Sequence, residues 1–487
     1  MSPRKQPPTA HLQYLDLYQS QQDYIDQHSL PVLQAQRDFA LEALSEYALP
    51  QRGMEDWQRI DIESLYAPDY GINLQELDLA PAGHKQLPQY SCDLSVNELT
   101  IKASALNSNY LYTHYANQKR KLPEGVFVGS IKEFVKEYPD LVERYYGQIA
   151  EVDTDGTIAL NTLFVQDAFV LYVPDGMQLE QPVQLVQLLH AQEPLLCIRR
   201  WLIILGDRAE ASILVCDHTI DRTSFLVNQV AEIFVGDGAQ LKLFDMEENS
   251  HQTHRTCGYF LRQGAESQVT LAAYTLNNGI TRNSFRTRFL GEHAEQTLGG
   301  VAVTNGTQHV DTFTRVEHIK PKCHSTQLFK NLLEEQSTGA FSGRIFVAQS
   351  AQQTEAYQSN RNMLLSPEAR MYSKPQLEIY ADDVQCSHGM ATGHLDEEAL
   401  FYMMQRGIPE HEARVMLSVA FVGDVIALMP LEDLQDRIES IVQMCIRDRI
   451  CGRPLRLAHA SASMEHISSS TSLQAMRMRA STTTSAR

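Results

Sequence analysis

The residues best suited by type and spacing to a chemical role lie in one short segment, residues 374–389. Within it Cys386 and His388 are two positions apart, so on an extended strand both side chains point to the same face. A thiol beside an imidazole can be held as a thiolate, which is both a nucleophile and a soft metal ligand. Asp382 and Asp383 lie just upstream, where they could orient the histidine or hold a hard cation. Two ligands make an incomplete metal site, so the others would come from elsewhere, including from another chain.

The same spacing also has a purely structural interpretation. A buried cysteine and a histidine whose ring bonds to backbone groups would account for it equally well, and spacing alone leaves both open. Cys323 and His324 are adjacent, so on a strand they would point to opposite faces and a shared ligand role is not expected. His309 and Asp311 share a face, and we expect a polar row on the solvent side of a strand.

The familiar signatures of enzymes are absent from the sequence. There is no G-x-x-x-x-G-K-[ST] loop, so the chain is not itself a P-loop ATPase. There is also no G-x-S-x-G, no H-E-x-x-H and no credible dinucleotide-binding fingerprint. The eight cysteines form no C-x-x-C pair. This pattern indicates neither a disulfide framework nor a zinc finger, and it favours a reducing compartment.

The composition narrows the class of protein further. The chain has 487 residues, 43% of them hydrophobic, which is enough for two or three domains. Lys and Arg number 41 against 60 Asp and Glu, a formal charge of −19, so a general nucleic-acid binder is not expected. The N-terminus has no apolar signal, and the longest apolar stretch, 415–430, is too short to span a bilayer. We therefore expect a soluble cytoplasmic protein.

From about residue 160 short apolar runs alternate with turns, as is typical of strands. The expected strands cover residues 169–173, 201–205, 212–216, 232–235, 240–244, 268–274 and 285–290. Similar turns place alanines at positions 209, 239, 265 and 294, at nearly regular spacing, with a further one at position 369. A recurring strand–turn–strand unit suggests a solenoid whose coils bury their apolar faces on one another. For residues 156–392 we favour a parallel β-helix over the alternative, an antiparallel sandwich.

Helical patterns lie on both sides of this region. Residues 1–155 are expected to be mostly helical, with helices over 33–47 and 131–146. Residues 393–443 are expected to form amphipathic helices, the first capped by Asp396 and ended by Gly407.

The second of these C-terminal helices has one apolar stripe, which we expect to pack on the end of the β domain, although such a stripe could also serve a partner. Its members are Ala413, Met416, Leu417, Ala420 and Phe421. The tail, 444–487, has seven arginines, two acidic residues and no clear apolar period, so we expect it to be disordered or non-native.

Segment 374–389, followed by 391–402 and 406–408, resembles the C-terminal signature of the SufB/SufD family of the SUF iron–sulfur cluster assembly machinery. The Cys-Ser-His-Gly sequence at 386–389 is similar to the SufD branch, since SufB usually has a His-Glu pair there. The resemblance spans about residues 30–443. Further matching segments are His309-Val-Asp311, Thr314-Arg-Val316, Ser342-Gly-Arg344, Thr354, Asn360-Arg-Asn362, Leu364-Leu365, Leu49-Pro50 and Glu55-Asp-Trp57.

The resemblance implies a right-handed parallel β-helix flanked by N-terminal and C-terminal helical domains. It also implies a complex with SufB, joined through the end of the β-helix, and with two copies of the ATPase SufC. Cys386 and His388 would lie at the SufB interface and help to hold a nascent iron–sulfur cluster, with further ligands from SufB. The C-terminal helical region would bind SufC. The residues assigned to that contact are Leu395, Phe401, Tyr402 and Arg406.

On the same resemblance the chain would be a scaffold subunit and not an enzyme, because ATP would be hydrolysed only by SufC. FAD bound by the complex is a further implication, although no residue here can be assigned to it. The sequence leaves open whether the chain forms a homodimer where SufB is missing. Two alternatives from other classes remain at this stage. One is a cysteine-dependent transferase using Cys386 and His388, and the other is a carbohydrate-active β-helix enzyme using Asp382, Asp383 and Arg344.

Overall fold

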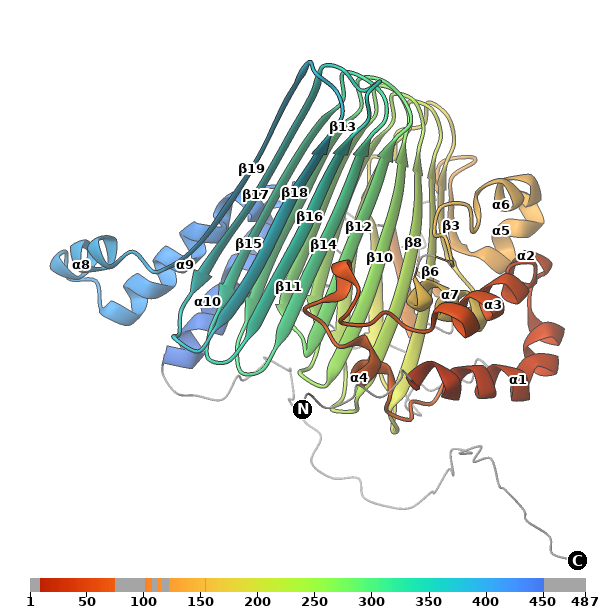
Figure 1. Ribbon diagram of the computed structural model, residues 1–487, viewed down its shortest axis with the longest axis horizontal. Helices are drawn as coiled ribbons and strands as arrows, with labels where there is room; N and C mark the ends of the chain where they lie inside the picture. Colours follow the sequence, from red (N-terminus) through yellow and green to blue (C-terminus); the bar gives the residue numbers. More distant parts are fainter. Residues whose placement is uncertain (1–8, 75–100, 107–112, 116–121, 154, 451–487) are drawn as a thin grey trace, which may run out of the picture.

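Successive strands of this chain alternate between two long sheets that wind into a β-solenoid of about eight turns over residues 169–394 (Figure 1). The computed structural model describes residues 9–74, 101–106, 113–115, 122–153 and 155–450. Helices flank the solenoid on its N-terminal and C-terminal sides. The expected parallel β-helix is therefore confirmed, and the antiparallel sandwich is excluded.

The nine-stranded sheet, here sheet A, and the ten-stranded sheet, sheet B, contain alternate strands of the chain. Sheet A consists of β3 (Phe127–Ser130), β4 (Phe169–Val173), β6 (Leu195–Leu205), β8 (Phe225–Val235), β10 (Thr253–Gln263), β12 (Ile280–Phe289), β14 (His309–His318), β16 (Thr338–Val347) and β18 (Arg370–Ile379). Sheet B consists of β1 (Ile101–Leu106), β2 (Thr113–Tyr115), β5 (Val183–Leu189), β7 (Glu210–Thr219), β9 (Gln240–Glu248), β11 (Gln268–Asn277), β13 (Glu295–Thr304), β15 (His324–Leu333), β17 (Thr354–Leu364) and β19 (Val384–His394).

Neighbouring strands within each sheet are parallel, apart from the antiparallel pairs β1–β2 and β3–β4. In sheet A, Ile280 lies opposite His309, and His309 lies opposite Thr338, so these two successive coils have the same length. The coil from His254 to its partner Ile280 is shorter, and the coil from Thr338 to its partner Arg370 is longer. The repeat is therefore regular only over part of the solenoid.

The turn alanines mark only part of this repeat. Ala209, Ala239 and Ala294 each directly precede a strand of sheet B and follow a residue with left-handed backbone, for example Arg208 with φ of 57°. Ala265 does not belong to the set, because Glu266 has the positive φ and Ser267 fills the equivalent position. Ala369 precedes β18 of sheet A, at the other edge of the solenoid, so its grouping with the others was wrong.

Aromatic rings contact one another along the inside of the solenoid, within sheet A and across to sheet B. Trp201, Tyr259, Phe285, Phe329 and Phe341 form a continuous series, with ring centroids 5.1–6.3 Å apart. Each of these side chains is almost fully buried. Ring contacts of this kind add about 0.5–1.5 kcal/mol each to the burial of apolar area.

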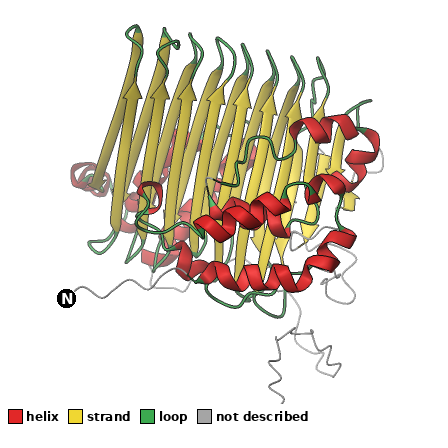
Figure 2. Cartoon of the chain, turned by 45° about the vertical axis from the view of Figure 1, so that its right-hand side comes forward, coloured by secondary structure: helices red, strands yellow, loops and turns green. Residues whose placement is uncertain are grey.

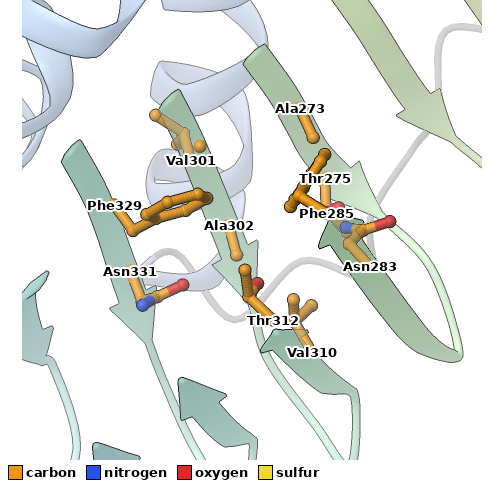
Figure 3. A pocket seen from close by; sticks show the side chains of 11 residues that line it. Ala273, Thr275, Asn283, Phe285, Val301, Ala302, Val310, Thr312, Phe329 and Asn331 are labelled. Carbon is orange, nitrogen blue, oxygen red and sulfur yellow. The ribbon is translucent and has the colours of Figure 1, made fainter. Parts of the chain in front are cut away.

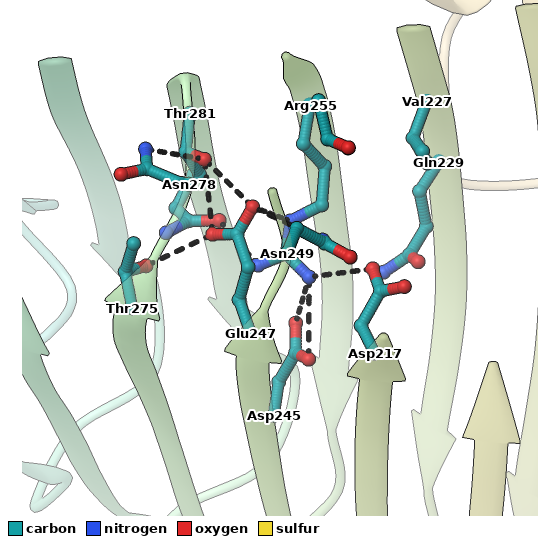
Figure 4. Close-up of polar contacts among 12 residues, drawn as sticks. Asp217, Val227, Gln229, Asp245, Glu247, Asn249, Arg255, Thr275, Asn278 and Thr281 are labelled. Carbon is teal, nitrogen blue, oxygen red and sulfur yellow. Dashed lines mark hydrogen bonds and ion pairs between the residues drawn. The ribbon is translucent and has the colours of Figure 1, made fainter. Parts of the chain in front are cut away.

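The interior also contains a network of charged groups (Figure 4). Arg199 makes two hydrogen bonds to Asp217, at 2.7 and 3.0 Å, and Arg255 lies 3.1 Å from Asp245 and 3.5 Å from Glu247. All five groups are buried. Burial raises the pKa of the Glu247 carboxyl and is only partly offset by Arg255. Such charges are tolerated inside a protein only when each is paired.

The N-terminal helices cover the outer face of sheet A over β6, β8 and β10 (Figure 2). They are α1 (Ala10–His28), α2 (Pro31–Gln34), α3 (Arg37–Tyr47), the 3-10 helix η1 (Glu55–Trp57), α4 (Ile62–Tyr66), α5 (Ile131–Glu137), α6 (Pro139–Tyr145) and α7 (Gly156–Phe164).

Two expected helices are each split in this region. Residues 33–47 contain the end of α2 and all of α3, and residues 131–146 contain α5 and α6. The second break falls at Tyr138-Pro139, because the residue before a proline is pushed out of the α region. Helix α7 lies at the start of the segment for which strands were expected.

Helices α8 (Glu397–Gln405), α9 (Glu410–Ile426) and α10 (Glu432–Ile450) follow the solenoid, and α9 and α10 pack on the outer face of sheet B. The Asp396 carboxylate caps α8 by accepting from the backbone N–H groups of Glu398 and Ala399, as expected. Gly407 has the predicted left-handed conformation, with φ of 85°. No helix among the described residues is long and apolar enough to cross a membrane.

Two expectations for these helices were wrong. Met416, placed in the buried stripe of α9, is exposed, and the helix instead buries a side that includes Val422 and Val425. Helix α10 continues to Ile450, well into the expected tail, because Cys445 and Ile446 extend its apolar stripe and are buried. The rest of the expected tail, 451–487, lies outside the described residues.

Candidate functional site at the open end of the solenoid

The last coil leaves the solenoid open at its C-terminal end. Strand β18 pairs only with β16 and β19 only with β17, so within the described chain each strand has one free backbone edge. Large apolar side chains are exposed on this coil: Ile379, Tyr380 and Met390. A long exposed strand edge with apolar side chains is a template for pairing with another chain.

Cys386 and His388 both lie on β19, opposite Ala356 and Gln358 of β17. Being two residues apart on one strand, they share a face, as the sequence predicted. Cys386 is half-buried and packs against the small apolar cluster that includes Ala356, whereas His388 is exposed. Burial raises the pKa of the Cys386 thiol, with partial compensation from the Ala356 backbone. In the free chain this shift favours the protonated thiol over the thiolate.

A row of polar side chains leads from the interior of the solenoid to His388. The Thr314 hydroxyl donates to Oε1 of Gln327 at 2.7 Å, and Nε2 of Gln358 donates to the same oxygen at 3.1 Å. Oε1 of Gln358 is buried and has no hydrogen-bond partner. Since Gln358 lies directly beside His388 in the sheet, an unsatisfied acceptor borders the exposed imidazole. Sequence reasoning missed this row, because the register between coils was not known.

The pair does not form a complete metal site by itself. No group of three or more histidine, cysteine or acidic side chains in the described ranges is arranged to hold a metal ion. Asp382 and Asp383 are exposed in the turn before β19, and the Asp383 N–H donates to Gln352 at 2.9 Å. No described hydrogen bond joins either aspartate to Cys386 or His388, so the suggested orienting role has no support.

The other candidate pairs have structural roles. Cys323 is buried and His324 half-exposed, consistent with side chains on opposite faces. Asp311 shares the outer face of sheet A with His309, but it is covered and not exposed to solvent as expected. It is buried and pairs with Arg282 at 2.8 Å, beneath the N-terminal segment, where the Trp57 ring stacks on that guanidinium at 4.4 Å.

Neither alternative enzyme site is assembled by the residues that the structure describes. The ion-pair partners of Arg344 are Glu55, Asp56 and Glu378, with none to Asp382 or Asp383 among the described residues. A transferase nucleophile would need a lowered thiol pKa, and that of Cys386 is raised. A small cavity between the sheets, lined by polar and apolar side chains such as Asn283 and Phe329, holds no more than a water-sized group (Figure 3).

The residues expected to bind an ATPase partner fall into two groups. Phe401 and Tyr402 are 62% and 60% exposed on α8, and the Arg406 guanidinium lies 5.2 Å from the Tyr402 ring centre. Leu395, in contrast, is buried in a small cluster with Leu400. It holds α8 in position and offers no surface to a partner.

Two family models match almost the whole described chain. The SufBD protein N-terminal region matches residues 8–185, and the SufBD core domain of SUF-system FeS cluster assembly matches residues 188–421. A SufBD family protein from Synechocystis is 27% identical over 424 residues, which cover 84% of this chain and 90% of the relative. The cluster assembly protein SufD from Escherichia coli is 29% identical over 234 residues, 48% of this chain and 55% of that protein. SufD from Bacillus subtilis is 26% identical over 340 residues, 69% and 77% of the two chains. The chain therefore belongs to the SufBD family of SUF-system iron–sulfur cluster assembly proteins.

Proposed function

We propose that this chain is a SufD-type subunit, a scaffold that pairs with SufB and docks SufC while an iron–sulfur cluster is built between the two solenoids. The observation that carries the proposal is the open end of the solenoid. On one coil of the described chain there is an unpaired strand edge, with exposed apolar side chains. The same coil has two candidate ligands, which are too few to complete a metal site.

The free edges of β18 and β19 favour a partner that also ends in strands. Pairing strand to strand would satisfy the backbone groups of both chains and cover Tyr380 and Met390. Such a joint would bring residues of the partner close to β19, and a ligand set split between two chains would be completed by it.

Cys386 and His388 are the two groups that this chain would contribute to the cluster. Iron is cargo here, because the cluster is passed on and not kept. A metal binds the thiolate, so binding at Cys386 would release the proton that burial retains in the free chain. The exposed ring of His388 needs no rearrangement of the chain to reach a cluster at the interface.

The exposed face of α8 would receive SufC. The apolar ring of Phe401 and the amphipathic ring of Tyr402 are exposed on a helix that projects from the solenoid (Figure 1). Aromatic residues of this kind often dominate the binding energy of interfaces. ATP would act only through SufC.

The test is anaerobic co-purification of the chain with its cognate SufB and SufC, measuring subunit stoichiometry, iron and sulfide. A ternary complex is expected, with cluster content reduced several-fold by His388→Ala and by Cys386→Ser. The matched control is His394→Ala on the same strand, which should leave cluster content unchanged. Phe401→Ser with Tyr402→Ser should remove SufC and retain SufB.

Two results would overturn the proposal. One is the absence of any complex between the wild-type chain and SufB. The other is a complex whose cluster content falls equally in the His388 and His394 variants, because the loss would then not depend on the site.

A further inference from the structure

Arginines stand side by side on the outer face of sheet A. Arg286 of β12 lies directly opposite Arg315 of β14. Two positions further along the same strand, Arg288 of β12 lies opposite Arg262 of β10. Neighbouring strands are about 4.8 Å apart, so these four side chains, here called the arginine patch, occupy a compact area.

Like charges on directly opposite strand positions destabilise a sheet. The pKa of Arg286 is lowered, mainly by burial and additionally by Arg282 and Arg315, although Asp155 acts in the other direction. The pKa of Arg262 is lowered by burial and by Arg288, against the attraction of Glu151 and Glu232. The four arginines therefore occupy neighbouring positions on one face in spite of their mutual repulsion.

The carboxylate between Arg288 and Arg315 leaves their terminal nitrogens without a described partner, whereas Nη2 of Arg262 donates to the Gln148 carbonyl at 3.3 Å. Glu317 accepts from Nε of Arg288 and from Nε of Arg315, both at 2.6 Å. No described hydrogen bond engages the terminal nitrogens of these two arginines, whose side chains are 46% and 43% exposed. Arg286 has its nearest carboxylate, Asp155, at 3.7 Å, and its own Nε is buried without a partner.

We propose that the arginine patch binds a small phosphate-bearing anion of the pyrophosphate class. Guanidinium groups match phosphate oxygens in a planar, two-point geometry that lysine cannot offer. Several donors within about one strand spacing favour one compact multivalent anion. Acidic side chains of an extended peptide would be spread about 7 Å apart on one face, a poorer match.

The patch is separate from the sites assigned above. It lies on sheet A, whereas α9 and α10 cover sheet B. Strands β10, β12 and β14 also lie in the middle of sheet A, away from the open end of the solenoid. The proposal therefore does not depend on pairing with SufB or docking of SufC.

The test is isothermal titration of the full chain with sodium pyrophosphate, and in separate arms with inorganic phosphate and ATP. Saturable binding of pyrophosphate is expected, and tight binding of ATP would identify nucleotides as the source of the phosphates. Arg288→Gln with Arg315→Gln should weaken binding by about tenfold or more, because two charge-assisted contacts are lost. The matched control is Arg414→Gln, since Arg414 is an arginine paired with one carboxylate on α9.

Glu317→Gln provides a second test with the opposite sign. It removes the carboxylate that competes for Arg288 and Arg315, so it should tighten pyrophosphate binding while lowering stability without ligand. If the salt bridge at Glu317 were only structural, Glu317→Gln would lower stability without tightening pyrophosphate binding. The proposal is overturned if pyrophosphate gives no saturable heat, if sodium chloride at equal ionic strength gives the same effect, or if the double arginine variant binds as the wild type does.

Discussion

Arg200 of β6 and Glu232 of β8 form a fully buried ion pair, with Nη2 of the arginine donating to Oε2 of the glutamate at 2.6 Å. The same carboxylate accepts from the backbone N–H groups of Gly147 and Ile149, at 2.8 and 2.9 Å. These two residues belong to the segment after α6. One side chain of the solenoid thereby fixes the N-terminal part of the chain to sheet A.

Replacing this carboxylate should be costly. Glu232→Gln leaves the Arg200 guanidinium buried without a counter-charge, and we expect the free energy of unfolding to fall by about 3 kcal/mol or more. Urea denaturation measures the change. The control is Glu410→Gln on α9, whose exposed pair with Arg414 contributes less than about 1 kcal/mol. Equal losses in both variants would show that Glu232 does not fasten the two parts together.

The buried imidazole of His318 should make the chain sensitive to acid. Burial, with a contribution from His324, lowers its pKa from 6.5 to about 3. The unfolded state therefore binds a proton at a higher pH than the folded state does. The stability linked to this group is complete above pH 6.5 and is lost as the pH falls toward 3, a loss on the order of a few kcal/mol.

The measurement is the free energy of unfolding at several pH values between 6.5 and 3. His318→Gln should flatten the slope in this range. Ser325→Ala removes the hydroxyl that lies 2.9 Å from the imidazole Nε2 but keeps the ring, so it should lower stability and retain the slope. An unchanged slope in His318→Gln would mean that other groups set the acid sensitivity.

The end of α10 should matter for stability. A chain ending at Gln443 lacks Cys445 and Ile446, both buried against sheet B, whereas a chain ending at Ile450 keeps them. We expect the shorter chain to be less stable by about 2–4 kcal/mol, from lost burial. Thermal unfolding compares the two, with Met444→Ser, at an exposed position, as the neutral control. Equal melting temperatures would show that the last turns of α10 contribute nothing.

For several strands only an apolar part could be predicted from the sequence, and the parts interrupted by buried polar residues were missed. The expected strand 201–205 is the end of β6, which begins at Leu195, and 232–235 is the end of β8, which begins at Phe225. The missed parts contain buried polar residues such as Arg199 and Asn228. These residues are paired inside the fold, and a search for apolar runs reads them as loop.

The site shows the same division. The period of two residues along a strand was enough to place Cys386 and His388 on one face. Their neighbour Gln358 depends on the register between coils, and the coil length changes along the solenoid in a way that no local pattern reveals. The helix break at Pro139 was, in contrast, readable from the sequence and was overlooked.

The open end of the solenoid should make the isolated chain self-associate. Without a partner, the free edges of β18 and β19 and the exposed Tyr380 and Met390 remain available to a second copy. We expect concentration-dependent dimers in sedimentation velocity experiments, and addition of SufB should dissociate them if both use the same edge.

Charges on the last coil should prevent this association. Tyr380→Lys with Met390→Lys should weaken the dimer at least about tenfold, since lysines on an edge strand or directly beside its end hinder strand pairing. Both positions are exposed, so the melting temperature of the monomer should change little. Phe401→Lys on α8 is the control, an equally exposed aromatic ring outside the coil. If that variant abolished the dimer and the double variant did not, self-association would occur through α8, and the free strand edges would not be the pairing surface.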